Sequence, residues 1–177
     1  MKGAGKGRWT RGIALIVLAL SVGLTTGATR DGWEVLSEPA QGFTLKDLSG
    51  KELRSAQLAG RIVVIDFWAT WCAPCVKELP DLTAYHERIE GRKDVTLLSL
   101  NVTDEAPALE AFIKEKKIAF PVYLGDPLLG PYEVVSFPTK LVIDMRGGGA
   151  VLRFRREGLT PIASLEARVE ELLRGEK

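Results

Sequence analysis

Two cysteines, three positions apart, are the most reactive pair of side chains in this sequence. The chain of 177 residues contains Cys72 and Cys75 and no other cysteine. A disulfide between them would enclose very few residues, and stabilisation by loop closure grows with the number of residues enclosed. We therefore interpret the pair as a site of thiol–disulfide exchange rather than as a structural cross-link.

The residues around the cysteines predict a strand that leads into a helix beginning at the pair. Residues 61–67 form a mostly apolar run with β-branched members, which is typical of a buried strand. From Cys75 to Ile89 the apolar residues recur with a helical period. A helix N-terminus favours negative charge, so we expect Cys72 to be a nucleophilic thiolate and Cys75 to resolve the mixed disulfide. Pro74 restrains the loop and has no backbone N–H to lose at a helix start.

The rest of the chain alternates strand and helix patterns, which predicts an α/β domain. Two short apolar pieces within residues 42–53 predict an N-terminal hairpin. We expect Thr103 and Thr160 to cap the two helices that follow them. Further strands are expected at residues 95–100, 120–124, 140–144 and 151–154.

The first thirty residues have the order of an export signal. Basic residues between Lys2 and Arg11 precede an apolar run, Ile13–Leu24, and small residues follow it. The uncharged stretch 12–29 is close to the length that spans a bilayer, so a cleaved signal peptide and an N-terminal membrane anchor both remain open. Either one predicts a periplasmic or other extracytoplasmic location. We therefore expect a leader at 1–30, a linker at 31–40 and one domain at 41–177.

Composition and single positions argue against several other functions. The net charge of +1 gives no field that would attract nucleic acid. Zinc needs about four ligands, and His86 is the only histidine beside the two thiols, so we expect no metal and no other cofactor. Covalent haem attachment needs a histidine after Cys75, where Val76 stands. Ala69 occupies the position where a peroxiredoxin-type peroxidase would have threonine.

Several motifs together resemble a known family. The segment Trp71-Cys72-Ala73-Pro74-Cys75 after a strand, with Pro80 beyond it, is similar to the thioredoxin superfamily. The run 66–72, the opening residues 42–45 and Phe137-Pro138-Thr139 resemble its exported TlpA/ResA-like, cytochrome-c-maturation branch. The resemblance covers about residues 41–176. It implies a thioredoxin fold, in which helices flank a central mixed β-sheet, with an N-terminal β-hairpin extension and a βα insertion.

The resemblance also implies a substrate-binding face beside the cysteines. Pro138 corresponds to a cis-proline next to the disulfide, where the backbone near Phe137 can pair with an extended substrate. Trp71, Ala73 and Pro74 complete the expected face. Phe137 is larger than the residue that this branch often has before the proline.

Two carboxylates are candidates for exchanging the proton of Cys75. Asp66 aligns with the buried acid of thioredoxin, although the TlpA/ResA branch commonly has asparagine there. Glu78 matches the acidic residue that ResA-like proteins carry on the active-site helix. Burial disfavours a charged carboxylate, which suits such a group to accept a proton. The sequence leaves the choice between the two open.

Together these features predict a thiol–disulfide oxidoreductase. We expect it to reduce disulfides in exported proteins such as apocytochrome c, and to be kept reduced by a membrane electron donor protein. Ala73-Pro74 lacks the histidine associated with strong oxidants of the superfamily. An exchange protein of oxidising direction and a binding or holding module for exported thiol proteins remain as alternatives.

Overall fold

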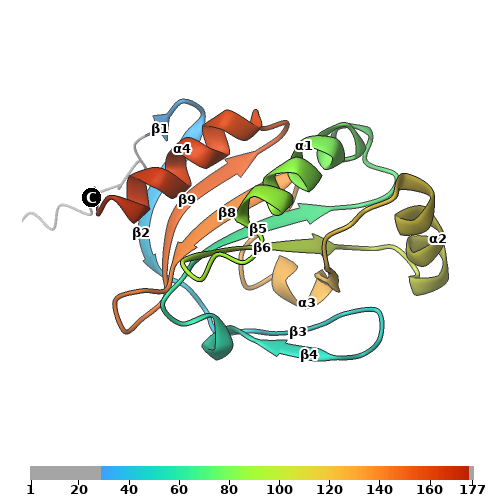
Figure 1. The fold of residues 1–177 in the computed structure, drawn as a ribbon, viewed down its shortest axis with the longest axis horizontal. Coiled ribbons are helices and arrows are strands. Elements are labelled where there is room, and N and C mark those ends of the chain that lie inside the picture. The colour runs from blue at the N-terminus through green and yellow to red at the C-terminus, as the bar shows by residue number, and fades with distance from the viewer. Residues whose placement is uncertain (1–28, 176–177) are drawn as a thin grey trace, which may run out of the picture.

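The computed structural model describes residues 29–175, and its core is a mixed sheet of seven strands in the order β1-β2-β9-β8-β5-β6-β7 (Figure 1). A separate two-stranded sheet is formed by β3 and β4. The strands are β1 (Thr29–Arg30), β2 (Trp33–Pro39), β3 (Thr44–Lys46), β4 (Glu52–Arg54), β5 (Ile62–Trp68), β6 (Val95–Asn101), β7 (Val122–Leu124), β8 (Thr139–Asp144) and β9 (Val151–Glu157). The helices are a short 3₁₀ turn (Ser55–Leu58), α1 (Ala73–Ile89), α2 (Ala106–Lys116), α3 (Asp126–Leu129) and α4 (Ile162–Leu173). The α/β class expected from the sequence is confirmed.

Strand β5 is the centre of the sheet, and every one of its residues is buried. It runs parallel to β6 on one side and antiparallel to β8 on the other. Its apolar, β-branched sequence fits this position, because both faces of a central strand in such a sheet are covered. The strand that leads into the cysteines is therefore held by two neighbours and by the layers above and below it.

Helices α1 and α4 lie on one side of the sheet, and α3 and the β3–β4 hairpin lie on the other (Figure 1). The two long helices contact each other, and α4 also contacts β5 and β8. Apolar residues of α1 face the sheet at a helical period, including Leu79, Leu82 and Ile89. At the carboxyl end of β5, Trp68 packs against Phe112 of α2, with ring centroids 5.8 Å apart.

The strands outside the centre of the sheet include both expected and unexpected elements. The hairpin predicted within residues 42–53 is present as β3 and β4. Between β6 and α3 the chain inserts α2 and β7, which adds an edge strand beside β6. Strand β2 occupies most of the range 31–40, where the sequence predicts a linker, and it pairs with β9. Trp33 anchors β2, because it is fully buried and its indole N–H donates to Ser164 of α4.

The expected signal peptide or anchor at 1–30 lies almost wholly outside the described residues. Within residues 29–175 no helix has both the length and the apolar character needed to cross a membrane.

Candidate active site

The two cysteines lie where β5 gives way to α1, as the sequence predicts. Cys72 is the residue that caps α1, and its Sγ accepts a hydrogen bond from the backbone N–H of Cys75 at 3.3 Å. The two sulfur atoms form a disulfide of 2.02 Å. Cys72 is 5% exposed and Cys75 1%, so the first cysteine is the more accessible of the two. An N–H that points at Sγ of Cys72 from the first helical turn stabilises negative charge on that atom.

A carboxylate that no sequence motif singles out fixes the loop before Cys72. Asp104 accepts hydrogen bonds from the backbone N–H and the hydroxyl of Thr70, both at 2.7 Å. It also accepts one from the side-chain amide of Asn101, the last residue of β6. Residues 69–71 are thereby tied to the end of the neighbouring strand. The signal in the sequence is an acid shortly after a buried strand, but its partner lies 34 positions away.

The expected substrate face is assembled from two loops. The Phe137–Pro138 peptide bond is cis, and β8 starts at the next residue. Phe137 is half-buried and meets the Trp71 ring edge to face, with centroids 5.9 Å apart. Trp71 is 64% exposed, and Ala73 and Pro74 beside it are exposed as well. An aromatic and apolar surface therefore continues from the first turn of α1 to the loop before β8.

Thr103 also holds Trp71, and the prediction that it caps α2 is wrong. Its hydroxyl accepts a hydrogen bond from the Trp71 indole N–H at 3.1 Å. The backbone of Thr103 is left-handed, with φ of 64°, and its N–H donates to Asp126. Glu105 is the residue before α2 instead, and its side chain makes no capping hydrogen bond. The hydroxyl is thus used to orient an exposed indole.

Both candidate carboxylates are buried and share a lysine. Asp66 of β5 and Glu78 of α1 are 1% and 4% exposed. Lys140 of β8 is 1% exposed, and its Nζ lies 3.0 Å from Asp66 Oδ1 and 2.5 Å from Glu78 Oε2. The contact with Asp66 is an ion pair outside hydrogen-bond geometry, whereas Lys140 donates a hydrogen bond to Glu78. The backbone N–H of Thr160 donates to the other oxygen of Glu78.

The surroundings shift the proton affinities of two members of this cluster. Burial raises the pKa of Glu78 above its ordinary value of 4.5, and the charge and hydrogen bond of Lys140 offset this only in part. Burial lowers the pKa of Lys140, but the negative charges of Asp66 and Glu78 outweigh it and raise that pKa above 10.5. A charged lysine therefore stands beside a glutamate that retains a proton more readily than usual.

Lys140 is expected from the sequence only as the first residue of a strand. A lysine directly before the apolar run 141–143 of a buried strand is nevertheless a visible signal, because lysine is almost never fully buried unless it is paired. Thr160 is expected to cap α4, but Pro161 is the capping residue and Thr160 contacts Glu78. Neither of these two contacts of Glu78 could be predicted from the local sequence pattern, because Glu78 is 62 positions from Lys140 and 82 from Thr160.

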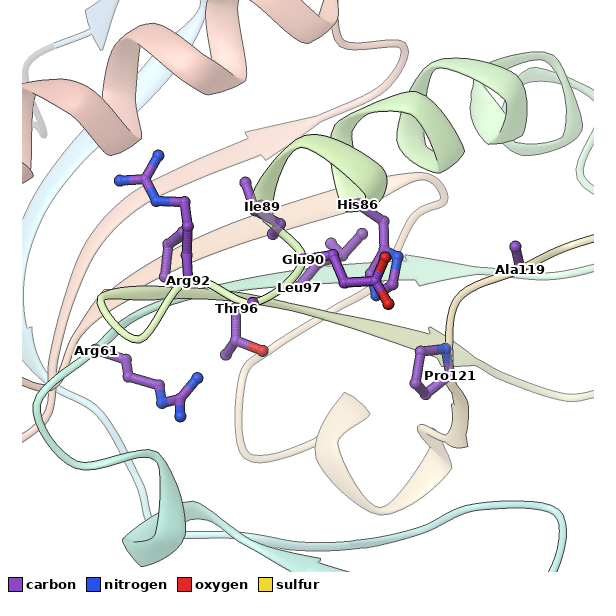
Figure 2. A pocket seen from close by; sticks show the side chains of 11 residues that line it. Arg61, His86, Ile89, Glu90, Arg92, Thr96, Leu97, Ala119 and Pro121 are labelled. Atoms are coloured by element: carbon purple, nitrogen blue, oxygen red, sulfur yellow. The ribbon is translucent and has the colours of Figure 1, made fainter.

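The single histidine is far from the cysteines. His86 lines a pocket of about 350 Å³ near the C-terminal end of α1. Figure 2 shows Arg61, Arg92 and His86 bordering this pocket, which lies at the start of β5, the opposite end of that strand from Cys72. Among residues 29–175 no cluster of three histidine, cysteine or acidic side chains is placed to bind a metal ion.

Comparison with known proteins gives consistent matches. The model of the AhpC/TSA family matches residues 36–148. Thiol-disulfide oxidoreductase ResA of Bacillus cereus is 32% identical over 142 residues, which cover 77% of this chain and 82% of the relative. ResA of Bacillus subtilis is 33% identical over 138 residues, covering 75% and 76%.

A solved structure confirms the fold that the resemblance implied. The crystal structure of a thiol:disulfide interchange protein of the thioredoxin family from Chlorobium tepidum TLS superposes with a TM-score of 0.65 at 26% identity. The match covers 76% of this chain and 94% of that protein. The mixed sheet with flanking helices is therefore a thioredoxin-like fold, extended by the β3–β4 hairpin.

Proposed function

Because this chain belongs to the AhpC/TSA family and is a ResA-like thiol–disulfide oxidoreductase, we propose that it reduces disulfides in exported proteins, oxidised apocytochrome c among them. The observation that supports this most directly is the Cys72–Cys75 pair at the first turn of α1. In the proposed cycle the reduced pair transfers two electrons to a substrate disulfide. A membrane electron donor protein then restores the two thiols.

Cys72 is the proposed nucleophile and Cys75 the resolving thiol. Cys72 is the more exposed cysteine, and the Cys75 N–H directed at its Sγ favours the thiolate. Its attack on the substrate disulfide forms a mixed disulfide and releases one substrate thiolate. Cys75, one turn deeper, then attacks Sγ of Cys72 and releases the second. Asp66 and Glu78 are the proposed acceptors of the Cys75 proton.

The surface beside Cys72 suits an extended segment of a protein substrate. Trp71, Ala73 and Pro74 offer an exposed contact area, and Phe137 with Pro138 forms the loop that borders it. An extended chain can pair its backbone along such a loop, while its side chains contact the aromatic rings. Partly unfolded exported proteins that carry a disulfide provide segments of this kind.

Sequence features support both the reducing direction of the proposed reaction and the export of the protein. The residues between the cysteines are Ala73 and Pro74, so the histidine associated with strong oxidants is absent there. Ala69 occupies the position where a peroxidase would have threonine. The basic, apolar and small order of the first thirty residues supports export, either with cleavage or with retention as an anchor. A reductant outside the cytoplasm needs electrons from a membrane protein, because its surroundings favour disulfides.

The reduction potential of the Cys72–Cys75 couple tests the direction. The full chain is equilibrated with dithiothreitol buffers of graded ratio, and the fraction of disulfide is measured. A reductase should have a potential near thioredoxin's, about −270 mV, and well below the value of about −120 mV found for a strong oxidant. A potential near the latter value would make this protein an oxidant and overturn the proposal.

Trapping identifies the substrate and the order of attack. Expressed in its own compartment, Cys75→Ser should accumulate mixed disulfides through Cys72, and apocytochrome c should be among the captured proteins. Cys72→Ser, with the buried thiol left, serves as the matched control and should capture little. Capture only by Cys72→Ser would reverse the assignment of the two thiols. Captured proteins that include no apocytochrome would contradict that substrate.

A further inference from the structure

The outer side of β6 is only partly covered by β7. Strand β7 pairs with β6 through Ser99–Asn101, whereas β6 begins at Val95. Within residues 29–175 no strand lies beside the outer edge of Val95–Leu98. Backbone N–H and C=O groups that point outward from a strand edge can bond to another extended chain. The first half of β6 therefore has the backbone chemistry of a strand-addition site.

This open edge lies in a pocket. The pocket has a volume of about 350 Å³, and residues 95–97 of the edge itself line it. The end of α1 and the segment that leads into β7 form its walls, to which they contribute His86, Ile89, Glu90, Ala119 and Pro121. Pockets that bind ligands start at about 300 Å³, so this one is large enough to receive a short piece of another chain.

The two sides of the pocket differ in character (Figure 2). Arg61 and Thr96 lie on the side of the sheet away from α1, whereas His86 and Ile89 lie on the α1 side. Ile89 is buried, and the His86 ring packs against Phe120 with centroids 5.9 Å apart. The side chains of an extended chain alternate between the two faces of its sheet. A strand added here directs alternate side chains toward Arg61 and toward an apolar and aromatic wall.

Arg61 gives the pocket an unpaired positive charge. Its side chain is half-buried, and within the part of the chain that the structure describes it has no ion-pair or hydrogen-bond partner. The charge of Arg92 is already compensated, because this residue pairs with Asp94 at 2.9 Å and with Glu170 at 3.4 Å. Glu90 is exposed at the end of α1, on the α1 side of β6. A carboxylate on the added chain is the group that suits Arg61.

We propose that the first half of β6 binds an extended acidic segment of another protein by strand addition. The segment pairs its backbone with residues 95–97, places a carboxylate beside Arg61 and packs apolar side chains against Ile89. The pocket lies at the opposite end of β5 from Cys72, so a bound partner leaves the disulfide accessible. The partner is therefore an attachment point rather than a substrate. The inference does not rest on the proposed function.

The test uses acetyl-Thr-Val-Glu-Val-Thr-amide as a probe. In extended form its glutamate points to one face and both valines point to the other, as the two sides of the pocket require. The peptide is added to isotope-labelled full-length protein, and the backbone amide signals are followed by NMR. We expect the signals of Val95–Leu98 to shift and saturate, while those of Phe137 and Thr139 stay in place. Shifts confined to Phe137 and Thr139 would place the peptide at the disulfide and overturn the proposal.

Two modified peptides separate the contribution of the backbone from that of the charge. N-methylation of the central residues retains the side chains but removes the backbone donors, and it should weaken binding by about tenfold or more. Glutamine in place of glutamate should weaken binding about three- to fivefold, because one ion pair near the surface is lost. Equal binding of the N-methylated peptide would rule out strand addition. These comparisons use the wild-type chain, so they decide the question even if a variant fails to fold.

Arg61→Gln is compared with the matched control Lys93→Gln. Lys93 is an exposed cation just before β6 and does not line the pocket. Arg61→Gln should abolish the preference for glutamate over glutamine in the peptide, whereas Lys93→Gln should retain it. A preference that survives in Arg61→Gln would contradict the assigned role of this guanidinium.

Two further outcomes would overturn the proposal. Charged side chains beside a strand edge can also serve to prevent pairing, and in that case no peptide shifts the signals of β6. Shifts of the same signals that grow with protein concentration alone would identify a second copy of this chain as the occupant. Neither outcome changes the reduction potential of Cys72–Cys75 or the trapping of substrates, so it is distinguishable from a failure of the proposed function.

Discussion

The Trp71 ring meets the Phe137 ring edge to face, with centroids 5.9 Å apart and an angle of 69° between their planes. The first residue precedes Cys72 and the second precedes Pro138, so this contact joins the loop before α1 to the loop before β8. The indole is also held by Thr103. An exposed aromatic side chain fixed in this way is a preorganised contact for a protein partner.

Trp71→Ala should therefore impair protein substrates selectively. Truncation of an aromatic anchor at an interface costs about 1–2 kcal/mol, which corresponds to a roughly tenfold lower kcat/KM for reduction of insulin. Oxidised glutathione, which is too small to use the whole surface, should react at a nearly unchanged rate. Thr103→Val removes only the hydrogen bond to the indole and should have a smaller effect. Equal losses on both substrates would place Trp71 in the chemistry rather than in binding.

Glu78→Gln should change how stability depends on pH. The pKa of Glu78 is raised in the folded chain above its ordinary value of 4.5, so folding favours the protonated form. This contribution is fully present below 4.5 and is lost as the pH rises through the folded pKa. Urea midpoints measured from acidic to neutral pH should therefore show the wild type losing stability relative to the variant. If the wild type instead became more stable relative to the variant over this pH range, the pKa of Glu78 would have to be lowered in the folded chain.

Gly125→Ala should destabilise the loop between β7 and α3. A Cβ at this position would lie 2.8 Å from Leu100 Cβ and 3.0 Å from Val102 Cγ1. Overpacking of this kind costs about 1–3 kcal/mol in a buried site. Gly130→Ala is the matched control, because its Cβ would meet nothing within 4 Å and its φ is −64°. Urea unfolding of both variants checks the prediction, which fails if the two midpoints agree.

The centre of the active site was predictable because its signals are local. A buried strand, a turn and a helix start all fall within residues 61–75, and each follows from the residues next to it. Lys140 was not predictable in the same way. Its position opposite Asp66 depends on the register of β5 and β8, and its contact with Glu78 depends on how α1 lies across both strands. Neither relationship is encoded in a short window of sequence.

Strand β2 illustrates the same difference in the fold. Residues 33–39 mix apolar and acidic side chains without strict alternation, and a shift in register interrupts their pairing with β9. Such a segment has little strand signal of its own. It is extended because β9, more than a hundred positions later, offers an unpaired edge, and because Trp33 packs against Phe154. Thr103 likewise has the chemistry of a helix cap and is used for another purpose, since the cap signal is local and its real partner, Trp71, is not.

The short outer strands of the sheet have a consequence for the proposed action on partly unfolded proteins. An open, flat sheet edge would attract any extended polypeptide and seed aggregation. Here β1 has two residues and β7 has three, and Asp47 of the hairpin bridges to Tyr123 on the β7 side. Each of these two outermost strands therefore offers few backbone groups for indiscriminate strand addition. Under the proposed function, an extended substrate would pair instead with the loop at Phe137 and Pro138, where exchange with the disulfide follows.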